Sequence, residues 1–150
     1  MESSGEVVTE LMRLTAGLRR IARRRVTSEL GVSPLPEAQR ELLLVVEANP
    51  GIGVAAAAAR LGLAGNSVST LVNALVEAGL LVRETDPSDR RAVRLTLTAA
   101  ATQRLDAWRT LRTALLGGAL DKADDEDRKA IEAALPALRR LLNELREETP

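Results

Sequence analysis

The chain has 150 residues, of which 45% are hydrophobic and 28% charged, values typical of a folded globular protein. It contains no cysteine and no histidine, which excludes disulfides, zinc-finger sites, cysteine nucleophiles and histidine acid–base relays. The 21 basic and 21 acidic residues cancel, so any affinity for a polyanion must come from where the charges lie. Trp108 is the single aromatic residue, too few for a platform on which single-stranded nucleic acid could stack.

Targeting signals are the next class to consider. No apolar run approaches the ~20 residues that cross a bilayer. The first residues, MESSGEVVTEL, carry acids where a secretory signal carries a basic region. We therefore expect a cytoplasmic protein that makes no contact with a membrane.

The first predicted element is a helix over residues 6–26. Its apolar residues recur at steps of four and three, at Val7, Leu11, Leu14, Leu18 and Ile21. A period near 3.5 is typical of the seam between paired helices, and packing on the chain's own core is an equal alternative. Gly31, Pro34 and Pro36 break the pattern.

Three shorter helices are predicted over residues 36–48, 54–61 and 65–78, and the last two form a helix-turn-helix around Gly62. The buried side of the first carries Leu42, Leu43, Val45 and Val46. The buried face of the third carries Val68, Leu71, Val72, Leu75 and Val76. This arrangement leaves five uncharged polar side chains pointing outward, namely Asn66, Ser67, Ser69, Thr70 and Asn73.

After Gly79 the hydrophobic period changes to two. Leu80 and Val82 precede a polar loop over residues 86–91, and Val93, Leu95 and Leu97 follow it. This pattern predicts a β-hairpin whose tip carries Arg90 and Arg91.

Two long helices close the chain. The first is capped by Thr98 and is expected to run to Gly117-Gly118. The second opens with acidic residues 124–127 and should kink at Pro136. Acids at a helix start need no metal, so we expect neither a metal ion nor a cofactor.

A helix-turn-helix followed by an arginine-tipped hairpin predicts a winged helix, which fits duplex DNA part by part. The second helix can lie in the major groove, where polar side chains bond to base edges and phosphates. The hairpin can reach the minor groove, whose negative potential attracts arginine. We expect a mainly α fold of the α+β class, with an optional short strand between the second and third helices.

Residues 36–99 resemble the DNA-binding domain of the MarR (multiple antibiotic resistance regulator) family. The resemblance is carried by Asn66-Ser-Val-Ser-Thr-Leu-Val, Glu77-Ala-Gly-Leu-Leu-Val-Arg83, Asp86-Pro-Ser-Asp89-Arg90-Arg91 and Leu97-Thr98-Ala99. It implies that Asn66, Ser67, Ser69, Thr70 and Asn73 face the major groove. It further implies that Arg91 enters the minor groove, that Asp89 orients it, and that Arg90 and Arg94 contact phosphates. Arg83 is either a phosphate contact or part of a structural ion pair.

The resemblance also implies a homodimer that binds a palindromic operator and acts as a ligand-responsive repressor. Residues 1–32 and 100–150 would form the helical dimerisation region, and residues 33–99 the DNA-binding lobe. A small anionic or phenolic effector would bind between them, with Arg13, Arg20 and Trp108 as candidate contacts. Trp108 is otherwise simple packing. The cluster of Arg19, Arg20, Arg23, Arg24 and Arg25 is either a solvated helix face or a contact for phosphate or for an effector carboxylate.

One departure from the family is the absence of lysine and arginine between Leu61 and Val82, which predicts low base-specific affinity. Residues 60–94 hold five arginines and four acidic residues, so a monomer should bind weakly and affinity should depend on dimerisation. The alternative function is a winged-helix module that binds another protein. An enzyme is not expected, because the residues of common catalytic sites are missing.

Overall fold

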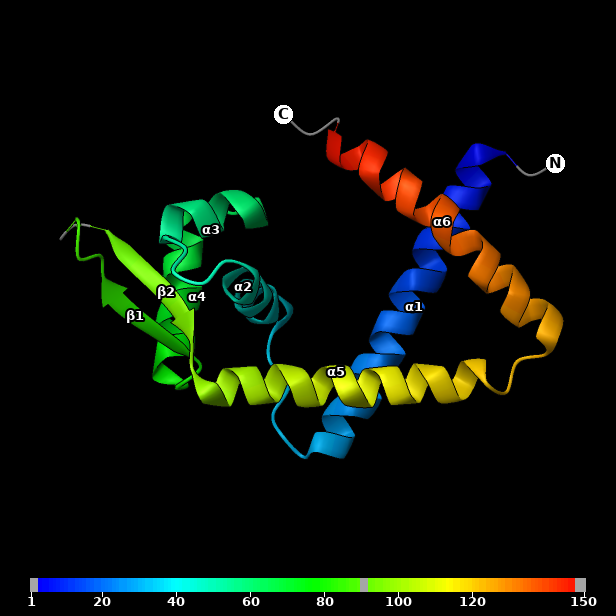
Figure 1. Cartoon of the computed structure of the whole chain (residues 1–150), viewed down its shortest axis with the longest axis horizontal. Coiled ribbons are helices and arrows are strands. Elements are labelled where there is room, and N and C mark those ends of the chain that lie inside the picture. Colours follow the sequence, from blue (N-terminus) through cyan, green and yellow to red (C-terminus); the bar gives the residue numbers. More distant parts are fainter. Residues whose placement is uncertain (1–2, 90–91, 148–150) are drawn as a thin grey trace. The chain divides into compact units, whose positions relative to one another are not determined.

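The computed structural model describes residues 3–89 and 92–147. These residues form, in order, α1 (Ser4–Leu30), α2 (Glu37–Ala48), α3 (Val54–Leu61), α4 (Gly65–Glu77), β1 (Leu81–Thr85), β2 (Val93–Leu97), α5 (Ala99–Leu120) and α6 (Asp125–Glu147) (Figure 1). The chain divides after Thr110 into two compact units. The predicted class, mainly helical with one small antiparallel sheet, is confirmed.

Helix α1 is fixed at both ends by local hydrogen bonds and backbone geometry. The Ser3 hydroxyl accepts from the Glu6 N–H at 3.3 Å, and the Glu6 carboxylate accepts from the Ser3 N–H at 2.7 Å. This capping box satisfies two amide donors that the helix itself cannot. Gly31, with φ of 61°, ends the helix in the left-handed conformation.

Most of the apolar stripe predicted on α1 is exposed in the described residues. Val7, Leu14, Leu18 and Ile21 are each 50–55% exposed, and Leu11 is half-buried. The two buried residues of α1 are Ala22 and Val26, which lie beside the stripe.

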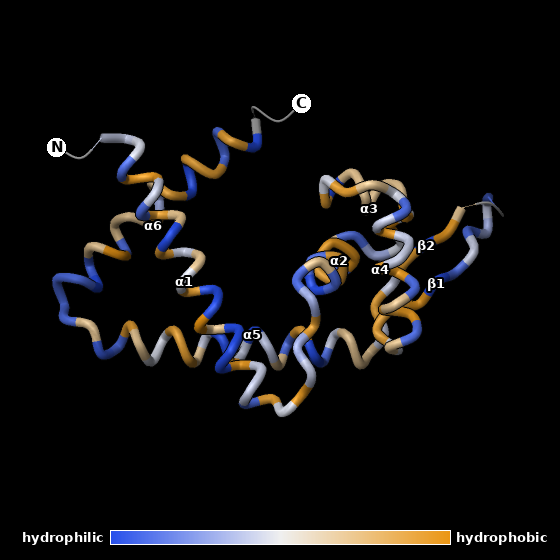
Figure 2. Tube along the Cα trace, turned by 180° about the vertical axis from the view of Figure 1, so that it is seen from behind, coloured by the Kyte–Doolittle hydropathy of each residue, from blue (hydrophilic) through white to orange (hydrophobic). Residues whose placement is uncertain are grey.

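The core of the first unit lies among α2, α3, α4, the two strands and the start of α5 (Figures 1 and 2). Its largest fully buried side chains are Leu42, Leu43, Val46, Val68, Val72, Leu75 and Leu95. Two residues of the predicted buried faces, Val45 and Leu71, are half-buried. Val76, also predicted to be buried, is 39% exposed. The face of α4 that packs on the core is therefore narrower than its sequence suggests.

The hairpin begins one residue later than its sequence pattern suggested. Leu81 is 2% exposed and Val82 is 37% exposed, whereas alternation through Leu80 and Val82 was predicted. The N–H of Leu80 donates to the Leu75 carbonyl at 2.8 Å, after the left-handed Gly79 (φ 69°). Leu80 therefore completes the end of α4, and the alternation starts at Leu81.

The two strands pair antiparallel, from Leu81 opposite Leu97 to Thr85 opposite Val93. The optional strand before α3 is reduced to a single bridge between Ile52 and Leu95. In the described residues the sheet thus has two strands, with Ile52 pairing as one residue at its edge.

Helix α5 starts at the predicted place and ends later than predicted. The Thr98 hydroxyl accepts from the Ala101 N–H at 3.1 Å and so caps the first turn. The helix continues through Gly117-Gly118 to Leu120. Glycine costs about 1 kcal/mol relative to alanine inside a helix. Two glycines in a helix of 22 residues do not cost enough to end it.

Helix α6 begins where the acids are and exposes its apolar face. The Asp124 carboxylate accepts from the Asp127 N–H at 2.8 Å, and the helix is unbroken at Pro136. Apolar segments recur along the tube of α6 in Figure 2. The apolar residues of the face are 39–57% exposed: Ile131, Leu135, Leu138, Leu141, Leu142 and Leu145. Within the described ranges, no helix combines the length and the hydrophobicity that crossing a membrane requires.

Candidate nucleic-acid interface

Helix α4 presents the predicted polar residues on its solvent side. Asn66, Ser67, Thr70 and Asn73 are exposed, and Ser69 is half-buried. Asn66, Thr70 and Asn73 are spaced by four and three residues, so they lie along one face of the helix. The opposite face carries the buried Val68, Val72 and Leu75.

The two hydroxyl groups on this face already donate to the helix backbone. Ser69 Oγ donates to the Gly65 carbonyl at 2.9 Å, and Thr70 Oγ1 donates to the Asn66 carbonyl at 3.1 Å. Their hydrogens are therefore occupied, and what remains toward solvent is oxygen lone pairs. Asn66 Oδ1 in turn accepts from the Ser67 N–H at 2.8 Å.

Asn73 is joined to the hairpin by a side-chain hydrogen bond. Arg83 Nη2, from β1, donates to Asn73 Oδ1 at 2.9 Å. Of the two roles predicted for Arg83, a structural ion pair is not found among the described residues, and a phosphate contact stays a prediction. The structure shows instead a bond to a neutral amide on α4.

The base of the hairpin loop is organised by Asp86, which the sequence analysis did not single out. Its carboxylate accepts from Ser88 N–H at 2.8 Å, from Ser88 Oγ at 2.6 Å and from Arg94 Nε at 2.7 Å. These bonds, those from Ser88 first, lower the pKa of Asp86 to about 2. The Asp-Pro-Ser sequence is a turn signal that could have identified it.

The predicted tip residues divide between described and undescribed parts of the chain. Arg90 and Arg91 lie outside the described residues. Asp89 is exposed, and its backbone closes the loop by donating to the Asp86 carbonyl at 3.2 Å and accepting from the Ala92 N–H at 2.9 Å. Arg94, predicted to contact phosphate, is half exposed and paired with Asp86.

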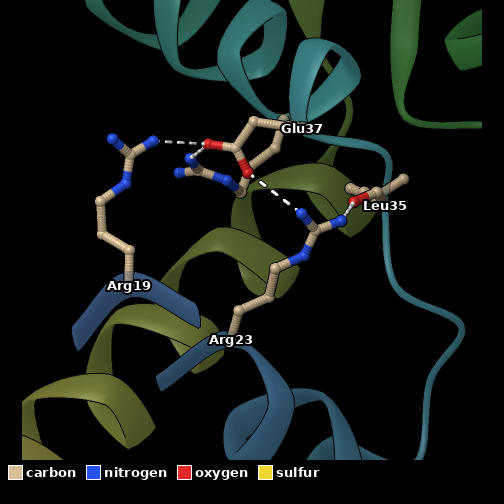
Figure 3. A network of polar contacts seen from close by, with 5 residues as sticks. Arg19, Arg23, Leu35 and Glu37 are labelled. Atoms are coloured by element: carbon tan, nitrogen blue, oxygen red, sulfur yellow. Dashed lines mark hydrogen bonds and ion pairs between the residues drawn. The ribbon is translucent and has the colours of Figure 1, made fainter. Parts of the chain in front are cut away.

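A second charged cluster joins α1 to α2, and Figure 3 shows Arg19 and Arg23 both pointing to the Glu37 carboxylate. Arg19 Nη2 donates to it at 3.1 Å and Arg23 Nη1 at 3.3 Å, and Arg40 also donates to it. Arg23 Nη2 donates to the Leu35 carbonyl at 2.8 Å. The pKa of Glu37 is lowered, chiefly by its hydrogen bond from Arg40.

A small cavity of about 40 Å³ adjoins this cluster. Its lining includes Arg23, Arg40, Arg104, Leu105 and Trp108. The Arg40 guanidinium lies 5.2 Å from the centre of the Trp108 ring, a cation–π distance.

Trp108, one of the three predicted ligand contacts, thus lines this cavity, and Arg13 and Arg20 do not line it. Arg13 is exposed and pairs with Glu10, which raises the pKa of Arg13. Arg20 is exposed on α1. Arg23 belongs to the arginine cluster for which an effector carboxylate was one predicted partner. Arg40 and Arg104 were missed, because their approach to Trp108 depends on how separate segments pack.

Acidic side chains offer no metal site in the described part of the chain, where no three of them are grouped to hold an ion. The acids at residues 124–127 lie at the start of α6, where Asp124 caps the helix. The candidate binding surfaces of the first unit are therefore α4, the hairpin and the arginine cluster around Glu37.

Comparison with known proteins agrees with this arrangement. Residues 30–92 match the model of the MarR family. A protein of Thauera aromatica, described as a transcriptional regulatory protein for the hcr operon, is 38% identical over 90 residues. The aligned region is 60% of this chain and 52% of that protein, so the chain spans about half the length of the relative it matches.

Solved structures share the fold. Rv1404 from Mycobacterium tuberculosis superimposes with a TM-score of 0.80 at 21% identity, over 95% of this chain and 97% of that one. FabT from Streptococcus pneumoniae, solved in complex with DNA, superimposes with a TM-score of 0.71 at 19% identity, over 95% of this chain and 99% of that one. The fold and the sequence match together lead to one conclusion: this chain has the winged-helix fold, and its residues 30–92 match the MarR family.

Proposed function

We propose that this protein is a transcriptional regulator that binds duplex DNA through α4 and the β1–β2 hairpin. The observation that carries the proposal is the exposed, uncharged polar face of α4 beside a hairpin that carries arginines. Such a face is suited to hydrogen bonding in the major groove. Asn66, Ser67, Ser69, Thr70 and Asn73 would contact bases and phosphates.

In this proposal the hairpin contacts the adjacent backbone and minor groove. Arg91 would enter the minor groove, Asp89 would orient it, and Arg90 would contact a phosphate. Arg94 would contact a phosphate with the part of its guanidinium that Asp86 leaves exposed. The DNA complex of the structurally similar FabT supports this use of the fold.

The protein acts as a homodimer in this proposal. The exposed apolar faces of α1 and α6 support it, because faces this long are covered by a partner in stable proteins. Residues 1–32 and 100–150 would form the dimerisation region, and residues 33–99 the lobe. Two-fold symmetry would then require a palindromic operator. In this proposal, binding of the dimer to that operator represses transcription.

An effector would act through the cavity beside Trp108. Arg23, Arg40 and Arg104 line it, which favours an anionic or phenolic molecule over a cation. These three replace Arg13 and Arg20 as the proposed contacts, because the cavity is not lined by Arg13 or Arg20. We propose no catalytic role.

The test is binding of the purified protein to the duplex upstream of its own gene, measured by fluorescence anisotropy against a scrambled duplex. We expect preferential binding of the native duplex that weakens as salt increases, since phosphate contacts release counterions. The variant Thr70→Ala on the α4 face should reduce the preference, whereas Glu41→Gln, on the exposed side of α2, should not. Equal binding to both duplexes, or none, would contradict the proposal, and none would favour a protein-binding module.

A further inference from the structure

The side-chain amide of Asn73 has a defined orientation in this structure. A guanidinium carries only donors, so the Asn73 atom that faces Arg83 Nη2 at 2.9 Å must be the oxygen Oδ1. The amino group Nδ2 is the other terminal atom of the same amide. Nδ2 carries two hydrogens that it can donate, and among the described residues the bond from Arg83 is the one that the structure shows for the Asn73 side chain.

This orientation restricts which base Asn73 could read. Asparagine usually recognises adenine by accepting from the N6 amino group and donating to N7 at once, which requires both ends of the amide. With Oδ1 bonded to the Arg83 guanidinium, an adenine N6 amino group, itself a donor, would have to share that oxygen with a cation. The end of the amide left open to DNA is the donor Nδ2. Guanine offers two acceptors in the major groove, N7 and O6, whereas adenine offers N7 alone.

We propose that Arg83 is a specificity-determining residue, because it holds the Asn73 amide with its donor end outward so that Asn73 selects guanine over adenine. This inference rests on the proposed function, since it assumes that α4 lies in the major groove. It deepens that function by assigning a base chemistry to one position of the recognition helix. Arg83 is a positioning residue here, acting through Asn73.

The rest of the face is consistent with such an assignment. Ser69 and Thr70 have their hydrogens on the helix backbone and present oxygen acceptors. The hydroxyl oxygens of Ser69 and Thr70 are thus followed, about one helical turn later, by the Nδ2 donor of Asn73. Because Arg83 comes from β1 and Asn73 from α4, the hairpin sets the chemistry of the helix as well as its own contacts.

The experiment is a selection of bound duplexes from a randomised pool, with sequencing, for the full-length protein and three variants. Asn73→Ala removes the donor. Arg83→Met removes the charge and every N–H, and Arg83→Gln removes the charge but keeps an N–H donor for Oδ1. The two Arg83 variants are matched in charge and differ in the property that the proposal invokes.

The wild type should favour guanine over adenine at one position of each half-site by roughly tenfold, and Asn73→Ala should lose that preference. Arg83→Met should shift the position toward adenine, whereas Arg83→Gln should keep guanine, even where both bind more weakly. Unchanged preference in Arg83→Met would overturn the proposal. A uniform loss of affinity in both Arg83 variants, with the preference intact, would make Arg83 a phosphate contact and would also overturn it.

A measurement without DNA keeps the two proposals separate. The side-chain amide signals of Asn73 in ¹H–¹⁵N spectra should move in Arg83→Met and stay near their wild-type positions in Arg83→Gln. If Arg83→Met leaves them in place, the pair does not exist and the inference fails while the proposed function stands. If the wild type selects no duplex at all, the proposed function fails and takes this inference with it.

Discussion

Single side chains in this protein set the state of their neighbours through short polar contacts. Asp86 accepts three hydrogen bonds at the base of the hairpin loop. Asn73 and Arg83 join the hairpin to α4. In both arrangements an arginine from a strand, Arg94 or Arg83, donates to an acceptor in another segment.

The titration of Asp86 is a prediction at this scale. Its pKa is about 2 against an ordinary value of 3.8, so the loop contacts are complete above pH 3.8 and are lost as the pH falls through about 2. Ser88→Ala should raise the pKa of Asp86, because it removes the hydroxyl bond that is the largest single cause of the shift, while the backbone N–H of residue 88 still donates. Carboxyl ¹³C shifts followed across the pH range measure the change, and an unchanged pKa in Ser88→Ala would contradict it.

Glu37 gives a second prediction, about stability. Glu37→Gln leaves three guanidinium groups without their shared anion and replaces one carboxylate oxygen by an amino group that cannot accept. It should therefore lower the free energy of unfolding by about 1 kcal/mol at pH 7. The lowered pKa means that this difference is present above the ordinary value of 4.5 and shrinks as the pH falls through the folded-state pKa.

Urea unfolding at pH 7 and pH 3 measures this difference. Glu41→Gln is the matched control, because Glu41 lies exposed on the same helix. An equal loss in both variants, or a difference that grows in acid, would mean that the Glu37 cluster does not stabilise the fold.

At the scale of elements, the core-facing side of each helix decides stability. Leu75 is fully buried and its neighbour Val76 is 39% exposed. Leu75→Ala should cost about 2–5 kcal/mol, whereas Val76→Ala should cost under about 1 kcal/mol, as surface changes do. Thermal and urea unfolding compare the two, and similar losses would place Val76 in the core after all.

Helix α5 offers an opposite, stabilising change. Gly117 and Gly118 lie inside it, and nothing lies within 4 Å of the position where a Cβ would be added at either. Gly117→Ala should therefore raise the free energy of unfolding by about 0.5–1 kcal/mol. A calorimetric scan tests this expectation, and a lower melting temperature would show that the helix bends or packs there.

Sequence patterns predicted the order and type of these elements well, because apolar periods and glycine stops are local properties. They failed where a tertiary neighbour decides. The burial of Leu81 in place of Val82 follows from how Leu80 ends α4. The role of Arg83 could not be read from the sequence, because its partner Asn73 is ten residues away and in another element. Asp86 could have been found from its turn, and the grouping of Arg23 and Arg40 near Trp108 could not.

For the whole molecule, the main unexplained feature within one chain is its uncovered apolar surface. In the described residues the apolar faces of α1 and of α6 are each about half exposed, and regular apolar surface of this kind marks interaction sites. Under the proposed function, these faces meet their counterparts in the second copy.

The corresponding prediction concerns self-association. Leu141→Asp, on the apolar face of α6, should weaken the dimer at least about tenfold, because it replaces buried apolar area with a charge. Asn143→Asp, which adds the same charge on the same helix away from the apolar positions, should have little effect. Sedimentation equilibrium distinguishes the two, and a wild-type protein that sediments as a monomer would contradict the assignment of the stem.

Thr98 carries a mechanical implication for any regulation of this fold. Its hydroxyl accepts from Ala101 in the first turn of α5 and donates to the Gly79 carbonyl at 2.8 Å, and its N–H donates to the Leu80 carbonyl at 3.2 Å. Thr98 thereby fastens the beginning of α5 to residues 79 and 80, which directly follow α4. We expect a rotation of the first turn of α5 to be passed through these bonds to the segment that follows α4.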